Sequence, residues 1–197
     1  MKVLALELSS SVGSVAFQVG DAHASFRTFP ADRQDAGFFF DNLSQIYKAN
    51  GPPEVIVVGL GPGSYAGVRI AIATATGLKI ASGARLLGVP SVCAIDQEEY
   101  VFLGDARRGS FVFAHVADGR CAEGPTLVTE DEIHAKLRTE PRLPVIATAT
   151  LAQFENVTVK HPSALRLLEL APGREGEATE ALEPIYLREP YITTPAG

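Results

Sequence analysis

The chain has 197 residues, of which 46% are hydrophobic and 20% charged, so its composition excludes a disordered or membrane-embedded protein. Its length fits one large domain or two small ones. The formal net charge is -6, which argues against a protein that grips a nucleic acid unaided, because such proteins usually present a basic patch. Any involvement with RNA is expected to run through another protein.

The first residues and the cysteines predict a soluble protein of a reducing cytoplasm. The N-terminal apolar run is short and lacks the features of a signal peptide, and no segment approaches the ~18 apolar residues of a membrane span. Cys93 and Cys121 lie far apart and form no C-x-x-C motif. This spacing suggests neither a zinc site nor a disulfide framework.

The first quarter of the chain predicts three antiparallel strands followed by a helix. Apolar, strand-favouring runs at residues 3–8, 14–19 and 23–29 are separated by glycine-containing turns. From residue 37 to residue 50 the apolar side chains follow helical spacing. The opening is therefore expected to be a three-stranded meander that leads into a helix.

Strands and helices alternate after this opening. Residues 55–58 are four consecutive aliphatics, typical of a strand covered on both faces. A helix is expected at 68–82, a strand at 86–89 and a short helix at 90–98. An antiparallel opening followed by alternating elements predicts a mixed sheet with packed helices.

The second half is less regular, and no internal repeat is visible. Strands are expected at residues 100–103, 110–116 and 145–149, and helices at 129–137 and 163–171. Thr129 is followed three residues later by Glu132, the spacing of a capping box at a helix start.

A glycine-rich segment joins the strand at 55–58 to the next helix. Its glycines at 59, 61, 63 and 67 leave room for an anion or for a closely approaching backbone. Pro62 removes one amide donor and occupies a position where a nucleophile elbow needs glycine, and no lysine completes a Walker motif. A structural turn is favoured, and a ligand-binding loop stays open as the alternative.

The helix at 68–82 carries aliphatic residues on its polar side. Ile72 and Ile80 project into the arc that Arg69, Thr76 and Lys79 define. Small residues at four-residue intervals (73, 77 and 81) permit close approach of another backbone. A helix that is apolar nearly all round is expected to be covered on more than one side.

The first helix repeats this feature, because Phe38 falls among polar residues. Two such helices predict a shared association surface. The alternative is that other parts of the same chain, or a bend in the helix, cover these positions. The predicted partner-binding residues are Phe38, Arg69, Ile72, Ala73, Thr76, Gly77 and Ile80.

Five segments resemble the TsaB family, in the same order from near residue 4 to near residue 188. GPGSYAGVRIAIATATGLKIA resembles the GPGSFTGLRIG segment of that family, and LALELSSSVGSVAF resembles its first strand, D-T-S segment and return strand. LLGVPSVCAI, GDARRGSFVFA and the terminal PIYLR resemble its later strands and its P-x-Y-L-R ending. Their order and coverage make the resemblance specific.

The resemblance implies an α/β fold of the actin/Hsp70 type (ASKHA, ribonuclease H-like) with two subdomains, each a mixed sheet with packed helices. We expect these subdomains at residues 1–98 and 99–197, with the C-terminal helix and tail packing back on the first. It also implies a non-catalytic subunit that binds the catalytic subunit TsaD, and TsaE, in forming threonylcarbamoyladenosine at position 37 of tRNA. A homodimer in isolation is expected through the same helices.

The resemblance implies no required cofactor, with ATP or ADP expected at most at a partner interface. Phosphate contacts would come from Ser9, Ser10, Gly61, Gly63 and Ser64. The chain departs from the family at Glu7, where the family usually has the aspartate that in nucleotide-using relatives helps to organise a metal. It departs again at residues 32–39, where the family's first helix usually begins with a histidine-containing segment.

No catalytic or metal-binding set emerges from the sequence. The histidines at 23, 115, 134 and 161 are isolated, whereas the catalytic relatives use two histidines spaced as H-x-x-x-H. Two alternatives to the subunit hypothesis remain: an enzyme of the same fold, either a peptidase or a small-molecule kinase, and a degenerate homodimeric relative outside the tRNA pathway.

Overall fold

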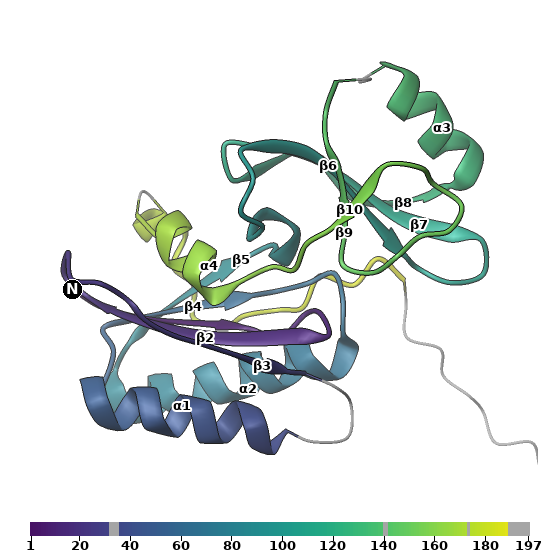
Figure 1. The fold of residues 1–197 in the computed structure, drawn as a ribbon. Coiled ribbons are helices and arrows are strands. Elements are labelled where there is room, and N and C mark those ends of the chain that lie inside the picture. Colours follow the sequence, from purple (N-terminus) through teal and green to yellow (C-terminus); the bar gives the residue numbers. More distant parts are fainter. Residues whose placement is uncertain (32–35, 140–141, 173, 189–197) are drawn as a thin grey trace, which may run out of the picture.

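A computed structural model describes residues 1–31, 36–139, 142–172 and 174–188. The described elements form two five-stranded mixed sheets with helices packed on them (Figure 1). The α/β fold class predicted from the sequence is confirmed. Among the described helices, none is long and apolar enough to cross a membrane.

The first sheet contains the predicted meander. Its strands are β1 (Lys2–Glu7), β2 (Val12–Val19), β3 (Ser25–Pro30), β4 (Val55–Gly59) and β5 (Arg85–Val89), in the order β3-β2-β1-β4-β5. The first three strands pair antiparallel, whereas β4 pairs parallel with β1 and β5 pairs parallel with β4. This sheet therefore joins an antiparallel opening to parallel strands, as the alternation of elements predicts.

The second sheet repeats this topology. Its strands are β6 (Glu99–Asp105), β7 (Ser110–Ala117), β8 (Arg120–Thr129), β9 (Val145–Ala147) and β10 (Val157–Val159), in the order β10-β9-β6-β7-β8. Counted from its own first strand, the order is again third, second, first, fourth and fifth. Two sheets of equal strand order are what an ASKHA-type fold with two related subdomains predicts. The limits at residues 1–98 and 99–197 stay a prediction.

The helices enclose the first sheet from both sides (Figure 1). Helices α1 (Gly37–Asn50) and α2 (Tyr65–Ser82) cover one face, and α4 (Ala164–Leu170) packs on the other. Alternate residues of β1 separate accordingly: Leu4 and Leu6 contact the α1–α2 side, while Val3 and Ala5 belong to the opposite core.

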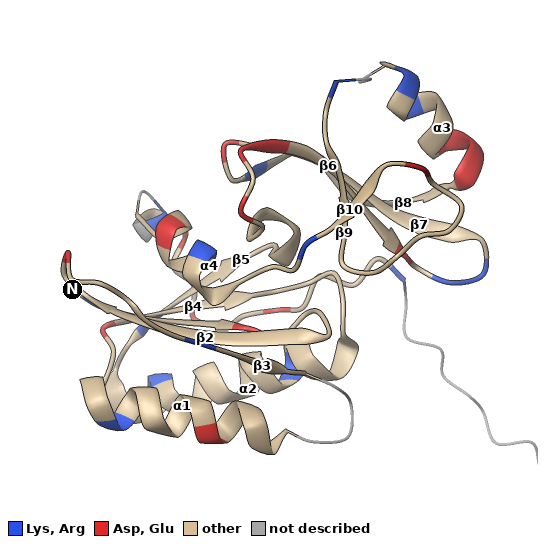
Figure 2. Ribbon diagram, in the orientation of Figure 1, with Lys and Arg blue, Asp and Glu red and all other residues tan. Residues whose placement is uncertain are grey.

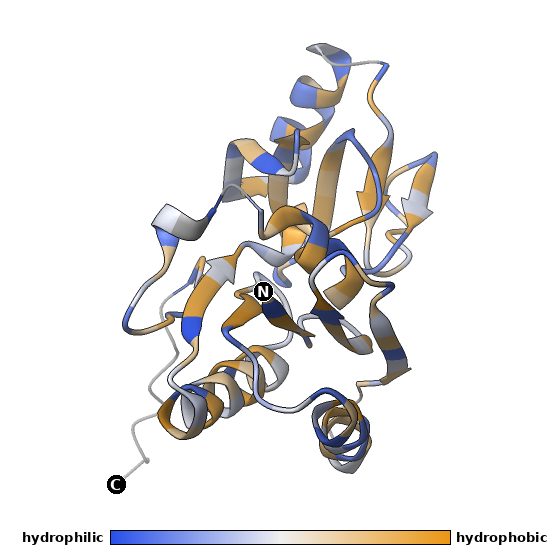
Figure 3. Cartoon of the chain, turned by 90° about the vertical axis from the view of Figure 1, so that its left-hand side faces the viewer, coloured by the Kyte–Doolittle hydropathy of each residue, from blue (hydrophilic) through white to orange (hydrophobic). Residues whose placement is uncertain are grey.

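The two sheets share that opposite core. Tyr100 and Phe102 of β6 lie in the same apolar cluster as Val3 and Ala5 of β1. A separate cluster on the far face of the second sheet packs against α3 (Glu130–Thr139) through Ile133. The central strands β1 and β4 consist mostly of buried apolar residues, whereas α3 carries many hydrophilic ones; Figure 3 shows the hydropathy along the chain. One central core thus joins the two halves.

Several predicted elements are confirmed with small changes in their limits. The helix at 37–50 and the strand at 55–58 are present, and α3 begins with the predicted capping box, in which the Thr129 amide donates to Glu132 Oε2 at 2.6 Å. Helix α2 begins at Tyr65 rather than at residue 68. The reason is that Ser64 caps it by accepting a hydrogen bond from the Gly67 amide at 3.2 Å.

The predicted short helix at 90–98 is wrong. Only a 3-10 turn, η1 (Ser91–Cys93), forms there. The Ala94 carbonyl accepts a hydrogen bond from the Ser163 amide at 2.8 Å, and Ile95 is fully buried in the central core. These tertiary contacts draw the backbone away from helical geometry, since a carbonyl so engaged points to another segment.

Helix α2 contains two glycines in opposite environments, which permits a matched stability test. A Cβ at Gly67 would lie 2.1 Å from the Leu8 carbonyl oxygen, whereas a Cβ at Gly77 would meet no atom within 4 Å. Gly67→Ala should destabilise the fold by ~1–3 kcal/mol through overpacking. Gly77→Ala should stabilise it by up to ~1 kcal/mol because alanine is the better helix former.

Urea unfolding followed by circular dichroism measures both variants. Equal effects of the two substitutions would contradict the close approach of the β1–β2 turn to the start of α2.

Candidate functional site

The end of β1 is organised around one buried carboxylate. The Glu7 side chain is fully buried; its Oε1 accepts the Ser9 amide at 2.7 Å and its Oε2 accepts the Ser91 hydroxyl at 2.8 Å. Burial raises the pKa of Glu7 above its ordinary value, while hydrogen bonds from Ser9 and Ser91 act in the opposite direction. Glu7, which stands where the TsaB family usually has aspartate, therefore finds its hydrogen-bond donors within this chain.

Ser91 extends this network to the glycine-rich segment. Its hydroxyl accepts the Gly61 amide at 2.9 Å, and its own amide donates to the Gly61 carbonyl at 2.8 Å. A Cβ at Gly59 would lie 1.7 Å from Glu7 Oε2. Glycine is therefore needed at position 59 because the Glu7 side chain fills the space that a Cβ would occupy. Sequence reasoning missed the importance of Ser91, whose only signal was its position after Pro90.

The remaining glycines face the β1–β2 turn. A Cβ at Gly63 would lie 2.2 Å from the Ser9 carbonyl oxygen, and the Ser64 amide donates to that same oxygen at 2.7 Å. Close approach of a backbone, one of the two interpretations left open, accounts for these positions.

The five predicted phosphate-binding residues differ in their surroundings. The amides of Ser9, Gly61 and Ser64 already donate within the chain. The Ser10 hydroxyl donates to the Val12 carbonyl at 2.9 Å and lies 3.2 Å from His161 Nδ1. Gly63 is exposed. A phosphate role for these residues stays a prediction.

A cleft of about 280 Å³ lies where the two halves meet. Pro62 and Gly63 line it from the first half, and Asp105 and Thr148 line it from the second, together with the tail residue Arg188. Figure 2 shows the charged residues of both halves in the same orientation as Figure 1.

The tail at residues 184–188 crosses this junction. The Ile185 amide donates to the Leu60 carbonyl at 2.9 Å, and Arg188 Nη2 donates to the Arg107 carbonyl at 3.3 Å. Tyr186 stacks on Tyr65, the first residue of α2, with ring centroids 5.4 Å apart. The tail therefore holds the glycine-rich segment close to the β6–β7 turn.

The predicted partner-binding residues lie on the outer side of α1 and α2. Phe38 is 48% exposed and Ile80 is 82% exposed. Ile72 is half-buried and packs against the core between these helices and the first sheet. The other predicted residues, which are Arg69, Ala73, Thr76 and Gly77, are exposed. The alternative was that other parts of the same chain cover these positions. They cover Ile72 in part, but they leave Ile80 exposed.

Other exposed groups add to this face. Phe40 is 49% exposed and lines a groove of about 550 Å³ together with Leu43, Tyr47 and Leu78. Of the nine large hydrophobic side chains that are exposed among the described residues, four lie on α1 or α2. We call this outer surface, which includes Phe38, Phe40 and Ile80, the α1–α2 face. Its partner-binding role stays a prediction.

The described residues bring together no group of three or more histidine, cysteine, aspartate or glutamate side chains that could hold a metal. His115 lies 3.0 Å from Glu99, and His134 lies 3.9 Å from Glu130. These are pairwise surface contacts. Residues 32–35, part of the departure at the first helix, lie outside the described residues.

Comparisons with known proteins agree with this architecture. Residues 51–124 match the family model described as TsaD, tRNA N6-adenosine threonylcarbamoyltransferase. Uncharacterized proteins of Mycobacterium tuberculosis and Mycobacterium bovis are each 30% identical over 143 residues, which are 70% of this chain. The match spans 65% of the length of these curated relatives.

Two solved structures from Pseudomonas aeruginosa superpose over nearly the whole chain. One is described as an uncharacterized protein with similarity to peptidase YEAZ; it has a TM-score of 0.78 and 23% identity, and the match covers 95% of this chain and 99% of that one. The other is YeaZ, with a TM-score of 0.73, 22% identity and coverage of 94% and 99%.

These matches and the two sheets show an α/β fold of the ASKHA-like class with two subdomains. The resemblance to the TsaB family, also called YeaZ, that the sequence predicts is confirmed by the YeaZ fold and by the TsaD-type segment at residues 51–124.

The buried Glu7 carboxyl predicts a pH-dependent stability. Because burial raises its folded pKa, the unfolded chain ionises first as pH rises above the ordinary value of 4.5. The folded state then binds the proton more tightly, so the free energy of unfolding falls with pH until the folded pKa is passed. The slope from this group is at most ~1.4 kcal/mol per pH unit.

Glu7→Gln keeps the shape and removes this titration. We expect the unfolding free energy of the variant, measured relative to that of the wild type, to increase as pH rises from 4.5. Urea unfolding across the pH range measures the difference, and parallel curves for the two proteins would refute this account of Glu7. Glu7→Ala, which leaves the Ser9 amide and the Ser91 hydroxyl without this acceptor, should cost ~2–4 kcal/mol.

Proposed function

We propose that this chain is a non-catalytic subunit that binds and activates a TsaD-type catalytic subunit in forming N6-threonylcarbamoyladenosine at position 37 of tRNA. The observation that carries the proposal is the α1–α2 face, where Phe38, Phe40 and Ile80 are exposed to solvent. Large exposed apolar patches are typical of protein-binding surfaces. The family resemblance supplies the identity of the partner.

The small residues of α2 support a helix-packing mode of binding. Ala73 and Gly77 lie four residues apart and are both exposed. Residues without large side chains let a second helix approach closely, and the aliphatic Ile80 beside them can then be buried. The proposal extends to a homodimer in isolation through this same face and to a TsaE-type ATPase as a further partner.

Nucleotide and RNA have secondary places in this proposal. Because the amides of Ser9, Gly61 and Ser64 are engaged within the chain, its own residues form an incomplete phosphate cradle. We assign ATP or ADP, if the complex uses it, to an interface that the TsaD-type subunit completes. The acidic balance of the chain, -6 in formal charge, favours indirect contact with tRNA.

Ile80→Asp should weaken the complex with a TsaD-type subunit at least about tenfold, or ~1.4 kcal/mol, because it would bury an unpaired charge in the interface. Ile80 is a better test than Ile72, which also packs against the core. Isothermal titration calorimetry measures the dissociation constants.

Leu165→Asp is the matched control. Leu165 is a 38% exposed aliphatic residue on α4, on the opposite face of the first sheet. We expect its affinity to stay within twofold of the wild type. Unchanged binding of a folded Ile80→Asp variant would reject the α1–α2 face as the docking surface.

Complementation separates the subunit hypothesis from its alternatives. In a strain depleted of its TsaB, the wild-type chain and Leu165→Asp should restore growth and threonylcarbamoyladenosine in tRNA, as measured by mass spectrometry of nucleosides. Ile80→Asp should restore less. Failure of the wild-type chain would favour a relative outside this pathway, and peptidase or kinase activity of the pure chain would favour an enzyme.

A further inference from the structure

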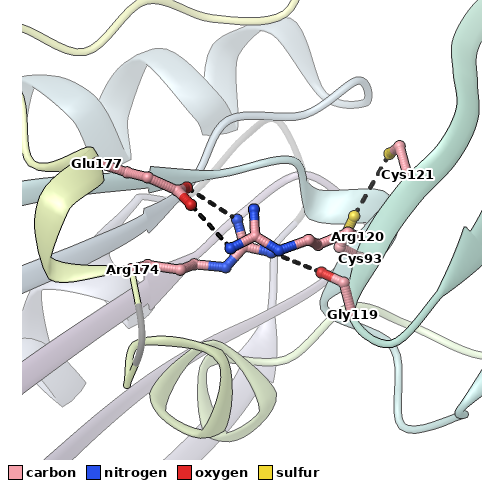
Figure 4. Close-up of polar contacts among 6 residues, drawn as sticks. All are labelled: Cys93, Gly119, Arg120, Cys121, Arg174 and Glu177. Atoms are coloured by element: carbon pink, nitrogen blue, oxygen red, sulfur yellow. Dashed lines mark hydrogen bonds and ion pairs between the residues drawn. The ribbon is translucent and has the colours of Figure 1, made fainter.

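The two cysteines lie next to each other in space. Although Cys93 and Cys121 are far apart in sequence, their sulfur atoms lie 3.4 Å apart, and both are free thiols. Cys93 ends η1 and belongs to the central core, and Cys121 lies on β8 and packs against that core, so the contact joins these two segments (Figure 4).

Two arginines lie beside this pair. Arg174 is 7% exposed; its Nη2 donates to the Gly119 carbonyl at 2.7 Å and its Nη1 lies 3.2 Å from Glu177. Arg120 also pairs with Glu177, at 2.9 Å. Figure 4 shows these contacts converging on the turn that precedes Cys121. Two guanidinium groups and one carboxylate give this cluster a net positive charge.

This environment makes the two sulfurs chemically unequal. The hydrogen bond with Cys93 lowers the pKa of Cys121, and the charge of Arg174 lowers it further, while burial acts in the opposite direction. The same hydrogen bond, followed by burial, raises the pKa of Cys93. Of the two thiols, Cys121 is therefore the one that ionises more readily.

Exposure agrees with this division of roles. Cys121 is half-buried on the edge strand β8, whereas Cys93 is almost completely buried. An incoming reagent reaches Cys121 first, and Cys93 is then in place behind it.

We propose that Cys121 and Cys93 form a peroxide-sensitive modification site, in which Cys121 is oxidised by a hydroperoxide and Cys93 resolves the product to an intramolecular disulfide. This site is independent of the proposed subunit function.

The chemistry balances with hydrogen peroxide as the only co-reactant. The Cys121 thiolate attacks one peroxide oxygen, so that an S–O bond forms, the O–O bond breaks and hydroxide leaves; hydroxide takes the proton lost by Cys121 and becomes water. The Cys93 sulfur then attacks the sulfur of the sulfenic acid, the S–O bond breaks, and the oxygen leaves as water with the Cys93 proton. Two electrons pass from the two sulfurs to the peroxide.

The disulfide would act as a lock between the two halves. Through Ser91, η1 is bonded to Glu7 and Gly61 of the first half, and β8 pairs with β7 in the second sheet. A covalent bond from Cys93 to Cys121 therefore ties the second sheet to the carboxylate network of the first, and oxidation should raise the Tm by on the order of 5 °C.

The full-length reduced chain, treated with hydrogen peroxide and then with iodoacetamide, tests the proposal. We expect both cysteines to escape alkylation, the mass to fall by two hydrogen atoms, and a peptide linking residues 93 and 121 to appear after digestion. Dithiothreitol should reverse all three changes. Thiols that stay alkylatable, or disulfides formed only between chains, would overturn the proposal.

Cys93→Ser and Cys121→Ser assign the roles. Cys93→Ser should accumulate a Cys121 sulfenic acid that dimedone traps, whereas Cys121→Ser should leave Cys93 largely unreacted. Faster oxidation of Cys93 than of Cys121 would overturn the assignment of Cys121 as the peroxide-reactive thiol. The wild-type mass measurement tests the pair even if a variant fails to fold.

Discussion

The structure depends on how it satisfies the buried carboxylate of Glu7. A carboxyl group without water must find hydrogen-bond donors inside the protein, and here the donors are the Ser9 amide and the Ser91 hydroxyl. Ser91 in turn binds both polar groups of the Gly61 backbone. One side chain therefore fixes the β1–β2 turn, the glycine-rich segment and η1 relative to one another.

This constraint reaches the junction of the two sheets. η1 carries Cys93 into the central core, where β1 and β6 place alternate residues in one apolar cluster. Because the cluster is common to both sheets, neither half can lose its partner without exposing apolar surface. The tail adds hydrogen bonds on both sides, through Ile185 and Arg188. The two halves are consequently coupled by packing as well as by covalent connection.

The features that the sequence predicts best are those with strong local periodicity. The four aliphatics of β4 and the helical spacing of α1 determine their own structure, and the Thr129–Glu132 capping box needs no distant contact. Strand β8 was not predicted, because most of its residues are exposed and it contains Pro125. It forms by pairing with β7. Its own residues show no regular alternation of apolar and polar side chains from which a strand could be predicted. The contact of Cys93 with Cys121 is likewise tertiary, and spacing along the chain carries no signal for it.

Helix α2 shows why one sequence segment supports two interpretations. At its start, Ser64 and Gly67 serve the capping interaction and the close contact with the β1–β2 turn, so their identity is explained within the chain.

Farther along the helix, Gly77 meets no neighbour and Ile80 faces solvent. Nothing within the described residues accounts for a small residue beside an exposed aliphatic one. An exposed glycine inside a helix costs stability. A surface that accepts this cost is best explained by a body that packs against it, which is why the proposed docking function rests on the second half of the helix rather than on its glycine-rich beginning.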